Sequence, residues 1–241
     1  MPASYATNKR FRGGLRTGAQ YIDGIKNDGR RVFIDGEEVA DVTTHPAFRE
    51  AVRSVAGLFD IASDPANRGV MTFPSPVTGK PVNRIWQVPR SQDDLYARRG
   101  AIARWAEATF GLMGRSPDHV AGFFAGWVSA PEVFARNGAT ERADNLVKFF
   151  EFLRDRDIFI TYTIVPPQID RSKPMHQQDP VDLYAGVVDE RDDGVVIRGA
   201  QMLGTGTALS DYVCLSQVTP VRPGDENHAI NVAIACNAPG V

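Results

Sequence analysis

The sequence predicts an α+β protein in which an N-terminal helical domain precedes an antiparallel β-domain. Up to about residue 157, apolar side chains recur at the three-to-four-residue spacing of helices. From residue 158 onward, β-branched and aromatic runs alternate with short turn signals. Helices that all precede the strands are typical of α+β proteins. We therefore expect a helical domain over residues 17–157 and a β-domain over residues 158–241.

The first part of the chain contains an arm, two helix starts and a hairpin. Residues 1–16 are polar and basic without periodicity, which predicts a flexible arm. Thr17 is a plausible N-cap for a short helix, and Asp-Gly at residues 35–36 predicts a β-hairpin. Thr44 is expected to cap a helix from about Pro46. The buried face of that helix is expected to contain Phe48, Val52, Val55, Leu58 and Phe59.

The rest of the helical domain follows an irregular segment over residues 63–90, which is rich in Pro and Gly. Ser91 is expected to open a long helix that Gly114 ends, and Ser116 is expected to be the N-cap of a second helix. A third helix is expected over residues 139–155. The core-facing stripe of the long helix is expected to contain Leu95, Ile102, Trp105, Ala106, Thr109 and Met113.

The β-domain begins with a β-branched and aromatic run that ends at a double proline. Turn signals then separate further apolar runs at regular spacing, which indicates an antiparallel sheet. The further strands are expected over residues 182–189, 194–203, 211–218 and 228–236.

Composition narrows the classes of function. The formal net charge is −2 and the pI is about 6.1, which argues against a general nucleic-acid binder. No apolar stretch is long enough for a membrane span, and the basic N-terminus lacks the apolar segment of a signal peptide. Cys214 and Cys236 are too few for a disulfide framework, and no metal-binding motif occurs. We expect a cytoplasmic protein without a metal site.

The strongest candidate for chemistry is the corner at residues 114–119, where Arg115, Asp118 and His119 gather at a helix N-terminus. Free N–H groups and the helix dipole favour an anion there. Arg115 could hold a phenolate or carboxylate, and His119 could move a proton near neutral pH. The alternative is an ordinary capped helix start, with Asp118 in its first turn and His119 exposed, and such capping is common.

Two further stretches could line a cofactor pocket. Residues 162–168 form a strand that runs into a double-proline corner, where hydroxyl and amide groups are available; an ordinary strand end is the alternative. Residues 204–210 form a small-residue turn whose backbone can approach a ligand, or else a plain loop. Leu209 and the lack of Gly-Lys-Ser/Thr exclude a dinucleotide fingerprint and a P-loop there.

Several motifs, in this order along the chain, resemble one enzyme family. They are TGAQYI at residues 17–22, DVTTHPAFR at 41–49, the helix over 98–106, GLMGRSPD at 111–118 and IVPPQIDR at 164–171. They are similar to the 4-hydroxyphenylacetate 3-monooxygenase family, the large oxygenase component of two-component flavin-dependent aromatic hydroxylases. The resemblance extends from about residue 15 to the end of the chain.

The resemblance implies an acyl-CoA-dehydrogenase-like fold, with a middle β-domain that is incomplete here and a C-terminal helical bundle missing from this chain. It implies that a separate NAD(P)H:flavin reductase supplies reduced FAD and that O2 is a co-substrate. A flavin C4a-hydroperoxide would then hydroxylate a phenol ortho to its hydroxyl. It also implies a homo-oligomer, a tetramer, when the protein is full length, and doubtful activity of this chain alone.

The resemblance also implies site residues. The substrate residues would be Arg115, His119 and Tyr162. The family has a Tyr where this chain has His119 and a His where it has Tyr162, so the two residue types are exchanged, which leaves the identity of the phenol open. The flavin is expected near Thr163, Val165, Gln168, Thr205 and Thr207.

Two alternatives remain. A 4-hydroxybutyryl-CoA dehydratase-like flavoenzyme would share the fold and add an iron–sulfur cluster, although the helical half of this chain contains no cysteine. The other alternative is an inactive, truncated fragment with a structural or assembly role.

Overall fold

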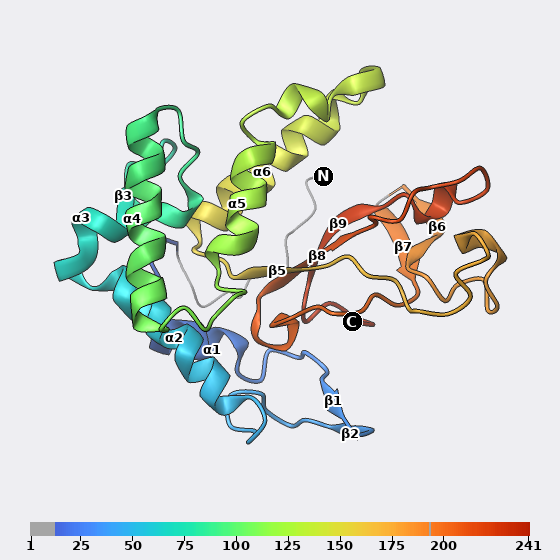
Figure 1. Cartoon of the computed structure of the whole chain (residues 1–241), viewed down its shortest axis with the longest axis horizontal. Coiled ribbons are helices and arrows are strands. Elements are labelled where there is room, and N and C mark those ends of the chain that lie inside the picture. The colour runs from blue at the N-terminus through green and yellow to red at the C-terminus, as the bar shows by residue number, and fades with distance from the viewer. Residues whose placement is uncertain (1–12, 193) are drawn as a thin grey trace.

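The structure, a computed structural model, describes residues 13–192 and 194–241 and contains a group of helices followed by a group of strands (Figure 1). The α-helices are α1 (Gly18–Ile25), α2 (Arg49–Ser63), α3 (Arg68–Met71), α4 (Gln92–Ala108), α5 (Asp118–Trp127) and α6 (Thr140–Asp155). In the described ranges every α-helix precedes β5, which confirms the predicted α+β order. None of these helices is both long and apolar enough to cross a membrane.

Short strands lie between the helices, and the longer ones follow them. The strands are β1 (Phe33–Ile34), β2 (Glu37–Glu38), β3 (Thr72–Pro74), β4 (Pro81–Asn83), β5 (Ile160–Thr163), β6 (Gly186–Arg191), β7 (Gly194–Arg198), β8 (Tyr212–Ser216) and β9 (Asn231–Ala235). Strands β1 and β2 pair in the predicted antiparallel hairpin, and β3 and β4 form a second hairpin inside the irregular segment.

Two helix starts agree with the sequence prediction. The Thr17 hydroxyl accepts a hydrogen bond from the Gln20 N–H at 3.2 Å, and the Gln20 side-chain oxygen accepts one from the Thr17 N–H at 2.8 Å. Ser91 and Asp94 form the same reciprocal capping box at the start of α4. Each box satisfies two backbone N–H groups at the helix start, so both helices begin where predicted.

The predicted start of α2 is wrong. The helix begins at Arg49, later than Pro46, and Thr44 does not cap it. Instead, the Asp41 carboxylate accepts hydrogen bonds from the N–H and the hydroxyl of Thr43, at 2.8 and 2.7 Å, and holds the preceding residues in a turn. The predicted apolar face is correct, because the cluster under this helix contains Phe48, Val52, Val55 and Phe59, and Leu58 is buried in the adjacent cluster.

Helix α4 buries only part of the predicted stripe, because Trp105 is buried as expected but Ala106 is exposed. Ala101 and Trp105 are buried, whereas Leu95 is 55% exposed. The Trp105 indole N–H donates to the carbonyl oxygen of Leu58 at 2.9 Å, which fixes the face that α4 turns toward α2. This contact between distant segments sets which face of α4 is buried. The periodicity of the α4 sequence alone cannot predict it.

Helix α4 also ends earlier than predicted, at Ala108 instead of close to Gly114. Phe110 and Gly111 follow with φ values of 53° and 71°, in the left-handed region. A right-handed helix cannot continue through such φ values, so the chain leaves the helix and reaches α5 as a loop.

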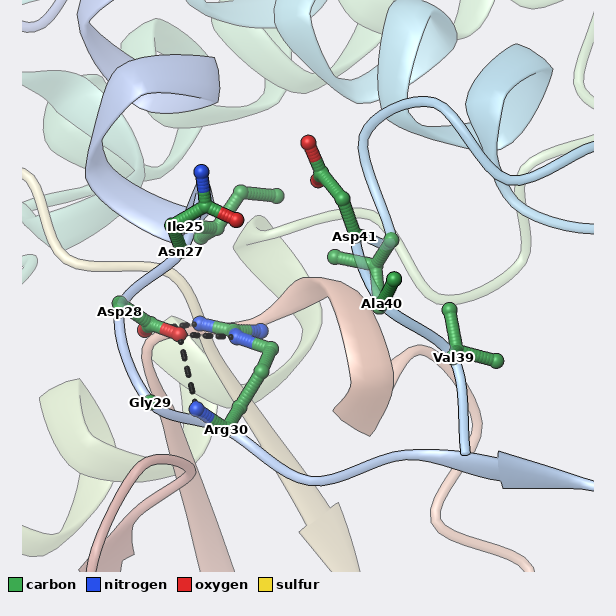
Figure 2. A pocket seen from close by; sticks show the side chains of 9 residues that line it. Ile25, Asn27, Asp28, Gly29, Arg30, Val39, Ala40 and Asp41 are labelled. Atoms are coloured by element: carbon green, nitrogen blue, oxygen red, sulfur yellow. Dashed lines mark hydrogen bonds and ion pairs between the residues drawn. The ribbon is translucent and has the colours of Figure 1, made fainter. Parts of the chain in front are cut away.

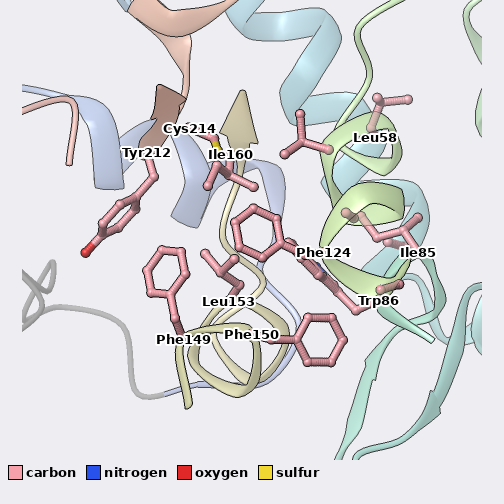
Figure 3. Close-up of a cluster of buried hydrophobic side chains, with 14 of the residues drawn as sticks. Leu58, Ile85, Trp86, Phe124, Phe149, Phe150, Leu153, Ile160, Tyr212 and Cys214 are labelled. Carbon is pink, nitrogen blue, oxygen red and sulfur yellow. The ribbon is translucent and has the colours of Figure 1, made fainter. Parts of the chain in front are cut away.

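One apolar cluster joins the helices to the sheet (Figure 3). The rings of Trp86 and Phe150 meet edge to face with centroids 5.9 Å apart. Phe149 of α6 packs in the same way against Tyr212 of β8 at 5.6 Å. Aromatic side chains bury large apolar areas, and their presence on both sides means that the helical and β halves share one core. Further members of this cluster include Leu58, Phe124, Leu153, Ile160 and Cys214.

The three-stranded sheet has the order β5-β8-β9 and is mixed, so the prediction of an antiparallel sheet is wrong for one strand pair. Strand β5 is parallel to β8, with Tyr162 opposite Cys214, whereas β8 and β9 are antiparallel. A parallel pair needs a long connection that returns the chain to the same end of the sheet. Residues 164–211 provide that connection and include the separate antiparallel hairpin β6-β7.

The predicted arm needs a correction at its last residue. Residues 1–12 lie outside the described residues. Arg16 is buried, and its guanidinium donates two hydrogen bonds to the Asp211 carboxylate at 3.1 and 2.7 Å. Its backbone N–H donates to Asp157 Oδ2 at 3.1 Å. Arg16 therefore belongs to the folded core, because carboxylates far along the chain bind it.

Candidate active site

The three residues predicted to bind substrate meet where α5 begins. Arg115 precedes α5, His119 lies in its first turn and Tyr162 lies on β5. The Arg115 Cζ atom is 5.6 Å from the centroid of the Tyr162 ring. The ring centroids of His119 and Tyr162 are 5.4 Å apart. The fold thus brings together Arg115, His119 and Tyr162, which we call the substrate trio.

The corner before α5 is held by Ser116, although not in the predicted way. The Ser116 hydroxyl donates to Asp118 Oδ1 at 2.5 Å, and the Ser116 carbonyl oxygen accepts from the His119 N–H at 3.0 Å. Pro117 stands at the N-cap position and makes no side-chain cap. Asp118 lies in the first turn, where the helix dipole favours a negative charge. This corner leaves Arg115 exposed to solvent.

The surroundings of His119 favour its neutral form. Burial has the largest effect and lowers the pKa of the imidazole; the positive charge of Arg115 lowers it further, and Asp118 acts in the opposite direction. The Nε2 atom is buried and has no hydrogen-bond partner within the described ranges. A neutral imidazole with an unpaired ring nitrogen can accept a proton from a ligand or donate a hydrogen bond to it.

Phe123 lies beside the substrate trio and was not predicted as a site residue. Its ring centroid is 4.9 Å from that of His119 and 5.7 Å from that of Tyr162. The spacing of four residues between His119 and Phe123 was the available signal, because such residues share one face of a helix. The contact with Tyr162 could not be predicted in this way, since it joins two separate elements.

Three of the predicted flavin residues organise a turn beside β5. The Thr163 hydroxyl donates to the Met202 carbonyl oxygen at 2.7 Å, and the Met202 N–H donates to the Val165 carbonyl oxygen at 2.7 Å. The hydroxyl oxygens of Thr207 and Thr161 are 3.2 Å apart. The polar groups of Thr163, Val165 and Thr207 named here therefore have partners inside the protein.

The other two predicted flavin residues, Gln168 and Thr205, are exposed. The Gln168 amide donates to the Pro166 carbonyl oxygen at 3.1 Å, within its own corner. Next to Thr205, Gly206 has φ of 80°, and a Cβ atom at Gly204 would lie 2.6 Å from a side-chain oxygen of the same turn. Glycine at both positions lets the backbone make this turn and present Thr205 to solvent.

A pocket of about 230 Å³ lies elsewhere, between the end of α1 and the residues after β2 (Figure 2). Asn27, Asp28, Arg30 and Asp41 contribute to its walls. Asp28 binds the Arg30 guanidinium through contacts of 2.9 and 2.8 Å, and Arg30 also donates to the Ala208 carbonyl oxygen at 2.8 Å. No predicted site residue lines this pocket, and Arg30 joins the N-terminal segment to the β half.

The sequence matches a described protein family over nearly its whole length. Residues 17–241 match the family model described as 4-hydroxyphenylacetate 3-hydroxylase N terminal. The oxygenase component of 4-hydroxyphenylacetate 3-monooxygenase from Geobacillus sp. (strain PA-9) is 36% identical over 228 residues, covering 94% of this chain and 46% of that protein. The oxygenase component of 4-nitrophenol 2-monooxygenase from Rhodococcus sp is 35% identical over 226 residues, covering 93% of this chain and 42% of that protein.

Solved structures agree with this match. The oxygenase component HpaB of 4-hydroxyphenylacetate 3-monooxygenase, complexed with FAD and 4-hydroxyphenylacetate, has a TM-score of 0.83 at 33% identity and covers 93% of this chain and 46% of that chain. A 4-hydroxybutyryl-CoA dehydratase from N. maritimus has a TM-score of 0.81 at 24% identity, which is a likeness of fold alone. The chain spans less than half the length of each of these relatives.

Proposed function

The chain belongs to the 4-hydroxyphenylacetate 3-hydroxylase family, and we propose that it forms the phenol-binding part of a reduced-FAD-dependent monooxygenase that hydroxylates a phenol ortho to its hydroxyl. The observation that carries this proposal is the convergence of the substrate trio from two elements. The Arg115 guanidinium carbon and the imidazole ring of His119, which has an unpaired nitrogen, each lie within 6 Å of the centroid of the Tyr162 ring.

Each member of the substrate trio has a task that its chemistry suits. Oxygen transfer to an aromatic ring is faster when the phenol is held as phenolate, because the ring is then richer in electrons. The positive charge of Arg115 stabilises that phenolate. Neutral His119 accepts the phenol proton at Nε2, and Tyr162 donates a hydrogen bond from its hydroxyl to the same phenolic oxygen.

The exchange of residue types changes which element carries the base. The base now lies on α5, next to Arg115, and the neutral hydrogen-bond donor lies on β5. Because Arg115 favours the neutral form of His119, the positive charge and the base act together on one side of the phenol. The phenol need not be 4-hydroxyphenylacetate, and other ring substituents are compatible with the trio.

The residues beside β5 fit a flavin. We assign the hydrogen bonds to FAD to the exposed side chains of Gln168 and Thr205, and the shaping of the turn to Thr163, Val165 and Thr207. When bound, reduced FAD supplies the electrons that activate O2 for insertion of one oxygen atom into the ring. A separate NAD(P)H:flavin reductase as the source of reduced FAD, a tetramer of the full-length protein and a cytoplasmic location complete the proposal.

The proposal is tested by binding and by product formation. The protein is titrated without oxygen with reduced FAD and with a panel of phenols that includes 4-hydroxyphenylacetate and 4-nitrophenol. Isotope-labelled O2 is then admitted, and the products are analysed by mass spectrometry. We expect this chain to bind a phenol, and we expect the full-length protein to give one labelled oxygen atom in an ortho-hydroxylated product. Failure to bind any phenol and to form labelled product would overturn the proposal.

The same samples separate the two alternatives. A dehydratase-like enzyme would contain iron by elemental analysis and would dehydrate 4-hydroxybutyryl-CoA. A fragment with only a structural role would bind neither phenol nor flavin. Gel filtration with multi-angle light scattering would then report whether that fragment assembles.

A further inference from the structure

Helix α5 presents aromatic rings at a spacing of four residues, starting at His119. The ring centroids of His119 and Phe123 are 4.9 Å apart with an interplanar angle of 63°, and those of Phe123 and Trp127 are 6.4 Å apart. Phe123 also meets Tyr162 of β5 nearly edge on, at 5.7 Å and 66°. Phe123 is therefore in ring contact with both aromatic members of the substrate trio.

Packing of the core does not account for Phe123. The side chain is 41% exposed, and it lies outside the apolar cluster that contains its neighbours Phe124 and Trp127. Because 41% of the side chain remains in water, Phe123 contributes less apolar burial to folding than Phe124, which is 3% exposed. Its ring contacts are with His119 and with Tyr162 and Trp127, which themselves pack against that cluster.

We propose that Phe123 is a positioning residue of the phenol site, whose ring holds the His119 and Tyr162 rings in one mutual orientation and keeps water from the His119 Nε2 atom. Edge-to-face contacts fix the relative orientation of aromatic rings as well as their distance. The role of Phe123 in a phenol site rests on the proposed function. Its effect on the orientation of the two rings does not depend on that function.

The pKa of His119 depends on the charged groups around it and on its exposure to water. A titration of His119 therefore tests its contact with Phe123. Arg115 lies on the preceding loop and Asp118 on the same helix, and both influence the imidazole. From α4, Arg98 interacts with Asp118, and its guanidinium lies beside Gly122 of α5. From β5, Tyr162 faces the imidazole ring. Phe123 supplies an uncharged wall, so its removal is expected to change solvation and leave these charges in place.

The test uses three variants of the chain. Phe123→Leu removes the ring but keeps an apolar side chain, and Phe123→Tyr restores the ring. Phe134→Leu is the matched control, because Phe134 is similarly exposed, at 38%, and contacts Trp127 at 6.4 Å on the same aromatic surface. Thermal unfolding confirms that each variant is folded, which the exposure of both side chains favours.

The first readout is the NMR titration of His119, which is assigned among the four histidines through His119→Gln. In Phe123→Leu we expect the pKa of His119 to rise toward its ordinary value, because water reaches Nε2. Phe123→Tyr and Phe134→Leu are expected to titrate like the parent. Nuclear Overhauser contacts between the rings of Phe123, His119 and Tyr162 are also expected in the parent chain, so the inference is testable even if one variant misfolds.

The second readout is the affinity for 4-nitrophenol, followed by absorbance. We expect Phe123→Leu to weaken binding by about fivefold, Phe123→Tyr to restore it and Phe134→Leu to leave it unchanged. Parent-like titration of His119 in Phe123→Leu, or absence of the ring contacts in the parent, would overturn the inference. If the parent chain binds no phenol, the proposed function loses its support, and the His119 titration still decides whether Phe123 positions the rings.

Discussion

Two groups of polar residues join the helical and β halves of this molecule, and they differ in how completely their atoms are paired. We call Arg16, Asn83, Asp157 and Asp211 the Arg16 cluster. In it, the Asp157 carboxylate accepts hydrogen bonds from the Arg16 N–H at 3.1 Å and from the Asn83 amide at 3.3 Å. The Asp211 carboxylate binds the Arg16 guanidinium and accepts from the Phe159 N–H at 2.8 Å.

The substrate trio also contains an arginine, but its polar atoms are less completely paired. Arg115 is exposed, and the buried Nε2 atom of His119 has no partner among the residues that the structure describes. Buried polar groups in folded proteins are nearly always paired, so an unpaired one beside an exposed cation indicates a place for a ligand. The Arg16 cluster therefore has the pairing of a structural element, and the open atoms of the trio agree with the binding role that we propose for it.

The largest expected effect comes from breaking the Arg16 cluster. Arg16→Ala removes the cation from the buried carboxylate of Asp157 and from the partly buried carboxylate of Asp211. Such a loss costs about 3–5 kcal/mol of the free energy of unfolding. Urea denaturation measures this loss. Arg53→Ala, which breaks an exposed ion pair with Glu50, is the control and is expected to cost less than about 0.5 kcal/mol. Similar values for the two variants would contradict this structural role.

The pH dependence of stability tests the same cluster at Asp157. Burial raises the pKa of Asp157 to about 6. The charge of Arg16 and the hydrogen bond from its backbone N–H lower this pKa, but burial has the larger effect. A carboxyl whose pKa is raised on folding holds its proton more tightly in the folded state. Its contribution to stability is therefore complete below its unfolded pKa of about 3.9 and is lost as the pH rises through 6.

Asp157→Asn removes this titration and keeps the shape, since Asn also tolerates the left-handed backbone of φ 48° at this position. We expect the stability of the parent relative to the variant to fall by up to about 3 kcal/mol between pH 4 and pH 7. Urea denaturation at a series of pH values measures the difference. A difference that stays constant with pH would show that folding leaves the pKa of Asp157 unchanged, and a difference that rises with pH would show that folding lowers it.

The two groups also differ in how far the sequence predicts them. Arg115 and His119 are close in the chain, at a helix start, so spacing alone brings them together. Arg16 is isolated in a polar stretch and was predicted to lie in an arm, because nothing near it in sequence indicates its partners Asp157 and Asp211. Phe123 was missed for a similar reason, since its contact with Tyr162 crosses from a helix to a strand.

The pairing of the strands is also set by contacts between distant segments. Apolar runs and turn signals locate the strands, but they do not give the direction in which distant strands pair. Strand β5 therefore was expected to be antiparallel to its neighbour and is parallel to β8. The capping boxes of α1 and α4 were predictable because each uses residues three apart. Local chemistry is readable in the sequence, whereas contacts between distant segments require the fold.

A smaller effect is expected when the substrate trio is broken. Arg115→Ala removes an exposed cation, so the free energy of unfolding is expected to stay within about 0.5 kcal/mol of the parent. The affinity for a phenol is expected to fall by about tenfold, because the phenolate loses its positive partner. Asp118→Ala, at the same corner, is the control and is expected to change affinity by less than about threefold. Equal, small effects of both variants would assign the corner to the helix start alone.

The smallest effect is expected for Tyr21→Phe. This substitution tests whether buried hydrogen bonds outside the Arg16 cluster also stabilise the fold. The ring of Tyr21 lies 5.8 Å from the Arg16 Cζ atom, and its buried hydroxyl donates to the Leu209 carbonyl oxygen at 2.8 Å. Tyr21→Phe keeps the ring stacked on Phe59 and deletes one buried hydrogen bond, which costs about 1 kcal/mol in the free energy of unfolding.

Tyr96→Phe is the matched control for this substitution. The Tyr96 side chain is 58% exposed, and its hydroxyl accepts from the Gln92 amide at 3.2 Å, so water can replace that partner. Urea denaturation is expected to find no measurable change for Tyr96→Phe. If Tyr21→Phe also left stability unchanged, the contact between α1 and the Leu209 carbonyl would be replaceable by water, and full pairing would be confined to Arg16 and its carboxylates.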